Sequence, residues 1–262
     1  HVMSVKQLFD LTGKVALITG GTKGLGLQMA EAFGEMGAKV FISARNAAEV
    51  DEVVAQLGQQ GIEAGGMACD LGKPESNPVK TLVDAVEAKF GTVDILVNNA
   101  GTTWGQPAAE HSYEGWNKVM YLNVDACFLM AQEVARRFMI PRQTGKIINI
   151  ASIAGLKGNR PNTGIFTVAY NTSKAAAINL TRALAGEWGP HNINVNAICP
   201  GYFPTKLSKG LEKVSEHIKQ GTPLGRVGGE EDIKGLAVFF ASEASRHVTG
   251  QAVAVDGGNS VV

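Results

Sequence analysis

Two side chains with complementary acid–base chemistry, Tyr170 and Lys174, lie four positions apart in a segment with a helical pattern. This spacing places both on one face of a helix, one turn apart. A free tyrosine titrates near pH 10, and a neighbouring ammonium favours the phenolate, so we expect Lys174 to lower the pKa of Tyr170 towards neutrality. Ser152 follows an apolar run and is placed to donate a hydrogen bond to a substrate oxygen. Together these residues outline a site that interconverts an alcohol and a carbonyl.

A tyrosine four positions before a lysine also occurs in ordinary helix packing, where the ring lies along the lysine stem. The catalytic interpretation therefore depends on the elements that position the pair. Residues 146–150 contain the apolar side chains of Ile147, Ile148 and Ile150, which predict a buried strand ending just before Ser152.

Comparable strand-like runs alternate with helical patterns along the whole chain. The predicted strands cover 14–19, 39–43, 64–68, 93–97, 146–150, 193–198 and 252–255. One predicted helix follows the glycine-rich segment 20–26. The others cover 50–60, 79–90, a pair within 112–139, 170–188 and 231–240. This alternation predicts one α/β domain over residues 3–262, with a doubly wound parallel sheet and helices on both faces. We attribute the two residues before Met3 to cloning, and we expect 207–226 to form a mobile helical flap.

Composition excludes several classes of partner. The chain of 262 residues has a net charge of zero, a pI of about 7.1 and no Lys/Arg cluster, which argues against nucleic acid or an anionic membrane. No apolar run reaches the length of a membrane span, and no signal peptide precedes the first strand. Cys69, Cys127 and Cys199 lack the spacing of a metal site, so we expect buried free thiols, no metal and a cytoplasmic protein.

The first strand is followed by a glycine loop that indicates a nucleotide site. Ligands of such sheets bind at the carboxyl ends of the strands. Gly20, Gly24 and Gly26 permit a tight turn and let a pyrophosphate approach the start of the next helix. The other loop residues expected to contact the cofactor are Thr22, Lys23 and Leu25.

The end of the second strand favours NADP(H) over NAD(H). NAD enzymes usually carry an acidic residue about 20 positions after the loop, whereas Ser43, Arg45 and Asn46 surround this strand end without a carboxylate. Arg45 is placed to form a charge-assisted fork with a 2′-phosphate, and Lys23 adds a second positive charge. Both could be solvated surface cations, but the missing acid decides for NADP(H).

Two further strand ends carry small or polar residues. Asp70, with Leu71 beside it, is placed to accept a hydrogen bond from an adenine amino group. Asn99, Ala100 and Gly101 follow the fourth strand and would lie beside a ribose. A simple strand-to-turn transition is the alternative for both, although it leaves the paired asparagines at 98–99 unexplained.

In combination, these motifs resemble the short-chain dehydrogenase/reductase family from Leu11 to Val262. The matching segments are TGGTKGLG at 19–26, DL at 70–71, NNAG at 98–101, Asn123, Ser152, YNTSK at 170–174 and PG at 200–201. The resemblance implies a Rossmann fold of about seven strands that interconverts a ketone and a secondary alcohol with NADP(H). Tyr170 would be the general acid/base, Lys174 would lower its pKa and bind the nicotinamide ribose, and Ser152 would polarise the substrate oxygen.

The resemblance implies further roles. Asn123, by itself only a poor helix former, would hold a water molecule that links Lys174 to solvent. Pro200, Gly201 and Phe203 would bracket the nicotinamide, and Thr205 would bind its carboxamide. A homotetramer is also implied, with the last strand near one interface and the helices at 112–139 and 170–188 at another.

The substrate stays open at this point. Ser152 and Tyr170 are 18 positions apart, a longer interval than in most family members, and the surplus is a loop at 158–166. The chain looks most like reductases of 3-oxoacyl thioesters and gluconate-type dehydrogenases. A sugar acid would need the cations Lys157, Arg160, Lys206 and Lys209, and a thioester the apolar residues Trp104, Phe166, Tyr202 and Phe203. The other class is a non-catalytic NADP(H)-binding redox sensor, which the presence of both Tyr170 and Lys174 disfavours.

Overall fold

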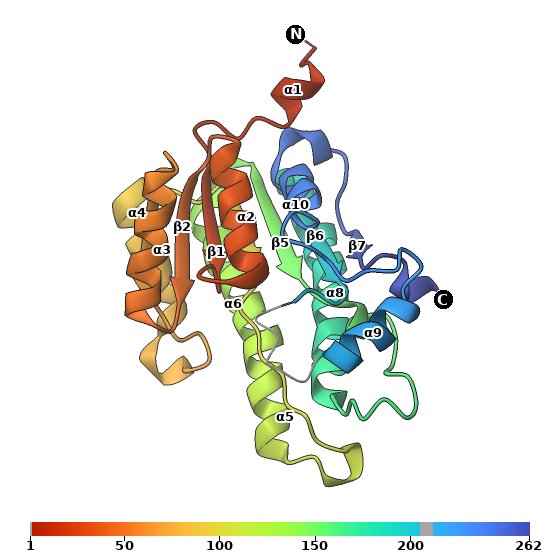
Figure 1. Ribbon diagram of the computed structural model, residues 1–262. Coiled ribbons are helices and arrows are strands. Elements are labelled where there is room, and N and C mark those ends of the chain that lie inside the picture. Colours follow the sequence, from red (N-terminus) through yellow and green to blue (C-terminus); the bar gives the residue numbers. More distant parts are fainter. Residues whose placement is uncertain (1, 205–211) are drawn as a thin grey trace.

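The computed structural model describes residues 2–204 and 212–262, without the side chains of 212–215, and contains one parallel sheet (Figure 1). The seven strands are ordered β3-β2-β1-β4-β5-β6-β7, and every neighbouring pair is parallel. The strands are β1 (Val15–Thr19), β2 (Lys39–Ala44), β3 (Ala64–Ala68), β4 (Ile95–Asn98), β5 (Gly145–Ile150), β6 (Ile193–Pro200) and β7 (Ala252–Val255). The predicted fold class and all predicted strands are confirmed, with small shifts at their ends.

Helices cover both faces of this sheet (Figure 1). The helices of the described residues are α1 (Val5–Leu8), α2 (Gly24–Glu35), α3 (Ala47–Gln59), α4 (Pro78–Phe90), α5 (Tyr113–Met120), α6 (Ala126–Val134), α7 (Ile140–Arg142), α8 (Val168–Trp188), α9 (Glu212–Gln220) and α10 (Lys234–Ala241). The hydrophobic cluster with α2, α3 and α10 lies on one face, and the cluster with α4, α6 and α8 lies on the other.

Strand β1 shows why the central strands are apolar throughout. Ala16 and Ile18 belong to the first cluster, whereas Val15 and Leu17 belong to the second, because successive side chains of a strand point to opposite faces. All residues of β1, β4, β5 and β6 are buried, whereas the edge strands β3 and β7 are only partly covered.

Local signals define several helix ends. The side chain of Asn46 caps α3 by accepting a hydrogen bond from the Glu49 amide at 3.1 Å. Gly91, with φ +78°, ends α4 in the left-handed conformation that glycine adopts without strain.

The long helical region differs from the predicted pair. Residues 113–142 form one uninterrupted helical path, in which the π-helical turns η3 (Tyr121–Asp125) and η4 (Ala135–Met139) separate α5, α6 and α7. The predicted helical structure over about 112–139 is therefore confirmed, whereas the two π-turns within it were not predicted. In the predicted flap, α9 confirms helical structure, while residues 205–211 lie outside the described residues.

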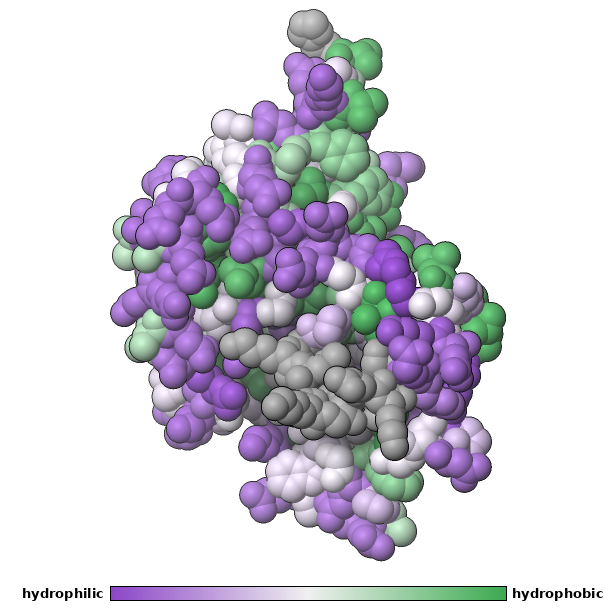
Figure 2. All heavy atoms as spheres, viewed as in Figure 1, coloured by the Kyte–Doolittle hydropathy of each residue, from purple (hydrophilic) through white to green (hydrophobic). Residues whose placement is uncertain are grey.

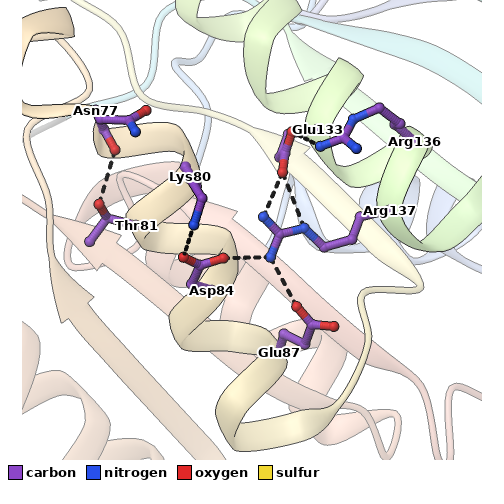
Figure 3. A network of polar contacts seen from close by, with 8 residues as sticks. All are labelled: Asn77, Lys80, Thr81, Asp84, Glu87, Glu133, Arg136 and Arg137. Carbon is purple, nitrogen blue, oxygen red and sulfur yellow. Dashed lines mark hydrogen bonds and ion pairs between the residues drawn. The ribbon is translucent and has the colours of Figure 1, made fainter.

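A cluster of charged residues joins the outer side of α4 to α6 and η4. Arg137 contacts Asp84 and Glu87 on α4 and Glu133 on its own helical path (Figure 3).

Much of the face in Figure 2 is hydrophilic. Among the described residues, no helix is long and apolar enough to cross a membrane.

Candidate active site

A cavity of about 820 Å³ lies where the carboxyl ends of the central strands meet the loops that follow them. Strand order reverses between β1 and β4, which is where ligands bind in open parallel sheets. The predicted site residues that line this cavity come from five separate segments of the chain. They are Leu25, Asn99, Gly101, Ser152, Tyr170, Lys174, Pro200, Gly201 and Phe203.

The structure brings the three predicted catalytic side chains together. Tyr170 and Lys174 lie one turn apart on α8, with the Lys174 Nζ 5.6 Å from the centre of the Tyr170 ring. Lys174 is buried, and its Nζ donates to the Ile150 carbonyl oxygen at 2.9 Å. Ser152 follows β5, and its Oγ accepts a hydrogen bond from the Ala154 amide at 3.0 Å and also interacts with Tyr170. The end of β5 and the start of α8 therefore build one site.

The electrostatics of this trio differ from the sequence-based expectation. Burial raises the pKa of Tyr170, and the hydrogen bond with Ser152 only partly opposes it. Burial also lowers the pKa of Lys174 to about 8, although Cys127 and Cys199 act in the opposite direction. The predicted net lowering of the Tyr170 pKa is thus not found, because burial of the Tyr170 hydroxyl outweighs the groups that favour its phenolate. The Lys174 Nζ is itself desolvated and directed to a strand carbonyl.

Asn123 lies in the π-turn η3, and its side chain clamps the loop after β4. Its Oδ1 accepts from the Thr102 amide and its Nδ2 donates to the Thr102 carbonyl, both at 2.9 Å. The same Nδ2 lies 3.0 Å from the Ser173 hydroxyl. Asn123 therefore connects the loop that borders the cavity to α8, and its predicted role in holding a water molecule stays a prediction.

The glycine loop is shaped for close backbone approach. Gly20 and Gly24 have φ values of +64° and +55°. A Cβ atom on Gly26 would lie 2.1 Å from the Gly20 carbonyl oxygen, so only glycine fits there. Thr22 is buried and donates to Glu49 at 3.4 Å, and Lys23 stands at the N-cap of α2. This loop leaves its backbone amides at the start of a helix, where an anion binds best.

The other predicted cofactor residues fall into two groups. Arg45 is exposed beside the end of β2, as binding of a 2′-phosphate requires, while Ser43 is buried and its carbonyl accepts from the Gly21 amide. By contrast, the side chains of Asn46 and Asp70 accept from the Glu49 and Gly72 amides. Leu71 is part of the hydrophobic core. Thr205 lies outside the described residues.

Sequence reasoning missed the residues that hold the cavity wall in place. The Thr19 hydroxyl accepts hydrogen bonds from the Asn99 and Ala100 amides, both at 3.0 Å, and so ties the end of β1 to the loop after β4. Beneath it, Asn98 donates to Asn149 and Asn149 donates to Thr181, each at 3.0 Å. An asparagine within each of two apolar strands was the available signal.

Each of the two predicted sets of substrate residues, the cations and the apolar residues, lines the cavity in part. Lys157 and Arg160 line the cavity, as do Tyr202 and Phe203, whereas Trp104 and Phe166 do not. Lys206 and Lys209 lie outside the described residues.

The cysteine prediction is only partly right. All three cysteines are free, but only Cys199 is fully buried, and Cys69 and Cys127 are half-buried. Within the described part of the chain, no three His, Cys, Asp or Glu side chains form a group that could hold a metal ion.

Comparisons with known proteins agree with this geometry. The family model described as "Enoyl-(Acyl carrier protein) reductase" matches residues 20–260. A gluconate 5-dehydrogenase of Gluconobacter oxydans is 38% identical over 262 residues, covering 99% of each chain. A 2-dehydro-3-deoxy-D-gluconate 5-dehydrogenase of Dickeya dadantii is 42% identical over 257 residues, covering 97% of this chain and 98% of the relative.

A solved structure shows the same fold with a cofactor bound. A gluconate 5-dehydrogenase from Burkholderia cenocepacia, in complex with NADP and tartrate, superposes with a TM-score of 0.90. It is 34% identical and covers 99% of this chain and 100% of its own.

Proposed function

The chain belongs to the short-chain dehydrogenase/reductase family of oxidoreductases, and on this premise we propose that it interconverts a ketone and a secondary alcohol of a sugar acid with NADP(H). The observation that carries the proposal is that Ser152, Tyr170 and Lys174 line one cavity at the carboxyl ends of the strands, near the place where strand order reverses. A sensor that only binds the cofactor has no need for this trio.

Each side chain has a distinct task in the proposed reaction. In the reducing direction, the hydride for the carbonyl carbon would come from bound NADPH. The Tyr170 hydroxyl donates a proton to the carbonyl oxygen, and in oxidation the phenolate takes it back. Ser152 donates a hydrogen bond to the same oxygen and polarises it. The Lys174 ammonium favours the phenolate whenever Tyr170 has given up its proton.

The residues present fit NADP(H). Gly26 leaves a space that a Cβ would fill, and the turn at Gly20 and Gly24 exposes backbone amides at the start of α2. Arg45 and Lys23 would bind the 2′-phosphate, and no carboxylate replaces them at the end of β2. We expect Arg45→Asp to raise the KM for NADPH about 100-fold and leave that for NADH nearly unchanged, since it removes a charge-assisted pair.

The proposed substrate class rests on the relatives, which are named for gluconate and 2-dehydro-3-deoxy-D-gluconate. The test is oxidation and reduction at 340 nm with gluconate, 5-ketogluconate, acetoacetyl thioester and an aryl ketone, using NADP(H) and NAD(H) in parallel. Turnover of the sugar acids with preference for NADP(H) supports the proposal. Faster turnover of the thioester would overturn the substrate class and keep the reaction.

The variant Tyr170→Phe separates chemistry from binding. We expect turnover to fall at least about 1,000-fold, because general acid–base catalysis contributes on the order of 100- to 10,000-fold. NADPH affinity, measured by quenching of protein fluorescence, should change less than about threefold, since the ring is retained. Near-normal turnover of this variant would remove Tyr170 from the mechanism.

We also propose the remaining features of the protein's setting. Residues 3–262 act as one catalytic domain, the molecule is a cytoplasmic homotetramer, and its partners are small molecules. The exposed apolar residue Val253 on the edge strand β7 supports an interface there, and three free thiols suit a reducing compartment. A monomer in light scattering at micromolar concentration would overturn the assembly.

A further inference from the structure

Two cations of the loop after Ser152 face the same cavity as Tyr170. Lys157 is half-buried and Arg160 is exposed, and both line the cavity together with His217 of α9 and Asn259 near the C-terminal end. A Cβ atom on Gly221 would lie 3.1 Å from the Arg160 Nη1, so the end of α9 lies close to this guanidinium. The loop and α9 thus form one end of the cavity, and the catalytic trio contributes to another part of its wall.

Oxygen atoms of Asn259 and Val262 hold these two cations. The Lys157 Nζ donates to the Asn259 Oδ1 at 2.7 Å and to its carbonyl oxygen at 3.0 Å. Arg160 donates to the main-chain oxygen of Val262 at 3.3 Å. Among the described residues, no aspartate or glutamate lies within salt-bridge distance of either cation. The loop therefore presents positive charge that side-chain carboxylates at this distance do not neutralise.

The electrostatic environment of Lys157 agrees with this arrangement. Burial lowers its pKa, and the neighbouring Arg160 lowers it further, while Asp256 acts in the opposite direction. The Asp256 carboxylate accepts from the Gly258 amide at 2.9 Å and the Ser260 amide at 2.7 Å, so it is occupied by the backbone of the tail. An anion placed beside Lys157 and Arg160 would relieve the repulsion between them.

The loop is fixed to the helix that carries the catalytic tyrosine. Asn171, the residue after Tyr170, donates to the Lys157 carbonyl at 3.3 Å and to the Asn159 side chain at 3.2 Å. Asn159 in turn donates to the Thr167 hydroxyl at 3.0 Å and to the Ile165 carbonyl at 3.1 Å. Solvated surface cations need no such support, whereas a binding site must hold its charges at a set position relative to the reacting group.

We propose that Lys157 and Arg160 bind the carboxylate of the substrate and so determine which of its carbon atoms reaches Tyr170. The inference rests on the proposed sugar-acid function and deepens it. Arg160 offers a planar fork that matches a carboxylate, and Lys157 offers a point charge beside it. Asn171 is a positioning residue in this arrangement, because it acts through the loop and not on the substrate.

The test compares an acid with its uncharged counterpart. Gluconate and gluconamide differ at the carboxyl group and present the same hydroxyl groups to Tyr170. We expect Arg160→Gln to lower kcat/KM for gluconate about tenfold, mainly through KM, and to change that for gluconamide less than about twofold, as for loss of one charge-assisted hydrogen bond at a partly exposed site. Arg160→Lys should recover much of the preference for the acid. Arg246→Gln, which removes an exposed arginine that does not line the cavity, should change neither substrate.

Binding measurements keep this inference separate from the proposed reaction. Calorimetric titration of the NADPH-loaded protein with both ligands gives the preference for the acid without any turnover, because the reduced cofactor cannot accept a hydride from gluconate. A preference that is lost in Arg160→Gln supports the subsite even if gluconate is not oxidised, in which case the proposed function fails alone. Equal binding of acid and amide by the wild-type protein, or an unchanged preference in Arg160→Gln, overturns the subsite even if gluconate is oxidised.

Discussion

The cluster around Arg137 and the cavity around Lys174 both gather buried or half-buried cations, but they treat the charge in opposite ways. Arg137 contacts three carboxylates, two of them from a different helix (Figure 3). Lys174 donates to a backbone carbonyl, and Lys157 to the amide and main-chain oxygen atoms of Asn259. One region pairs its charge with side-chain carboxylates, and the other, among the described residues, holds it with backbone and amide oxygen atoms.

The pKa values follow this difference. Burial lowers the pKa of Arg137, but the hydrogen bonds that it donates to Glu133, Asp84 and Glu87 outweigh burial and raise the pKa. Burial lowers the pKa of Lys174 to about 8, and no carboxylate of the described residues compensates. Paired charges therefore support the native structure, whereas burial of Lys174 destabilises it; in the proposed reaction its charge acts on Tyr170.

The largest expected effect comes from removing the unpaired charge. We expect Lys174→Met to lower turnover at least about 100-fold, because the phenolate of Tyr170 loses its stabilising charge. The same variant should be more stable at pH 7 by about 1–2 kcal/mol in urea unfolding. Removing the buried ammonium relieves a desolvation cost of up to about 3 kcal/mol. This gain exceeds the cost of leaving the Ile150 carbonyl without its hydrogen-bond partner.

The pH dependence gives that prediction a distinctive signature. Lys174 has a folded-state pKa below its unfolded value, so the unfolded state binds more protons between about pH 8 and 10.5 and wild-type stability rises there. The variant lacks this contribution. Its advantage should be constant below pH 8 and disappear as the pH approaches 10.5. A difference in the free energy of unfolding between the variant and the wild type that stays constant over this range would show that burial of Lys174 does not destabilise the protein.

The sequence predicts the sheet well because its signals are local. Each strand is a short apolar run, and the polar or glycine-rich residues after it mark the edge where ligands bind. The prediction that Tyr170, Lys174 and Ser152 share a site therefore rests on their spacing together with these strand ends and the family motifs. The helical region over 113–142 was also predicted, but its two π-turns were not, because a π-turn leaves no mark in composition.

The residues that support the site were harder to predict because their partners are distant in sequence. Thr19 accepts from Asn99 and Ala100, which follow a different strand, and Lys157 donates to Asn259. The pKa of Tyr170 also depends on how deeply the ring is buried, which spacing on a helix does not give.

A medium effect is expected from breaking the neutralised cluster. We expect Arg137→Met to lower the free energy of unfolding by about 1–2 kcal/mol, since Glu133, Asp84 and Glu87 all lose this half-buried partner. The hydrogen bond from Arg136 and, less strongly, that from Arg137 lower the pKa of Glu133, while burial opposes them. The loss of unfolding free energy should therefore be largest above the pKa that this carboxyl has in the unfolded state. It should shrink as the pH falls through the lower pKa that the carboxyl has in the folded state. Urea unfolding at pH 7 and pH 3 measures both, and kcat/KM should stay unchanged.

The smallest effect is expected one position earlier, where Arg136→Met provides a matched comparison. Arg136 also contacts Glu133, at 2.7 Å, but its side chain is 67% exposed against 17% for Arg137. An exposed pair is screened by solvent, so the free energy of unfolding should fall by less than about 0.5 kcal/mol. Both substitutions remove one arginine from the same helical path, and they differ chiefly in burial and in the number of carboxylates contacted. Urea unfolding could instead show that Arg136→Met lowers the free energy of unfolding as much as Arg137→Met does. The arginine charge itself, and not its burial beside carboxylates, would then stabilise this region, and the contrast with the Lys174 cavity would lose its physical basis.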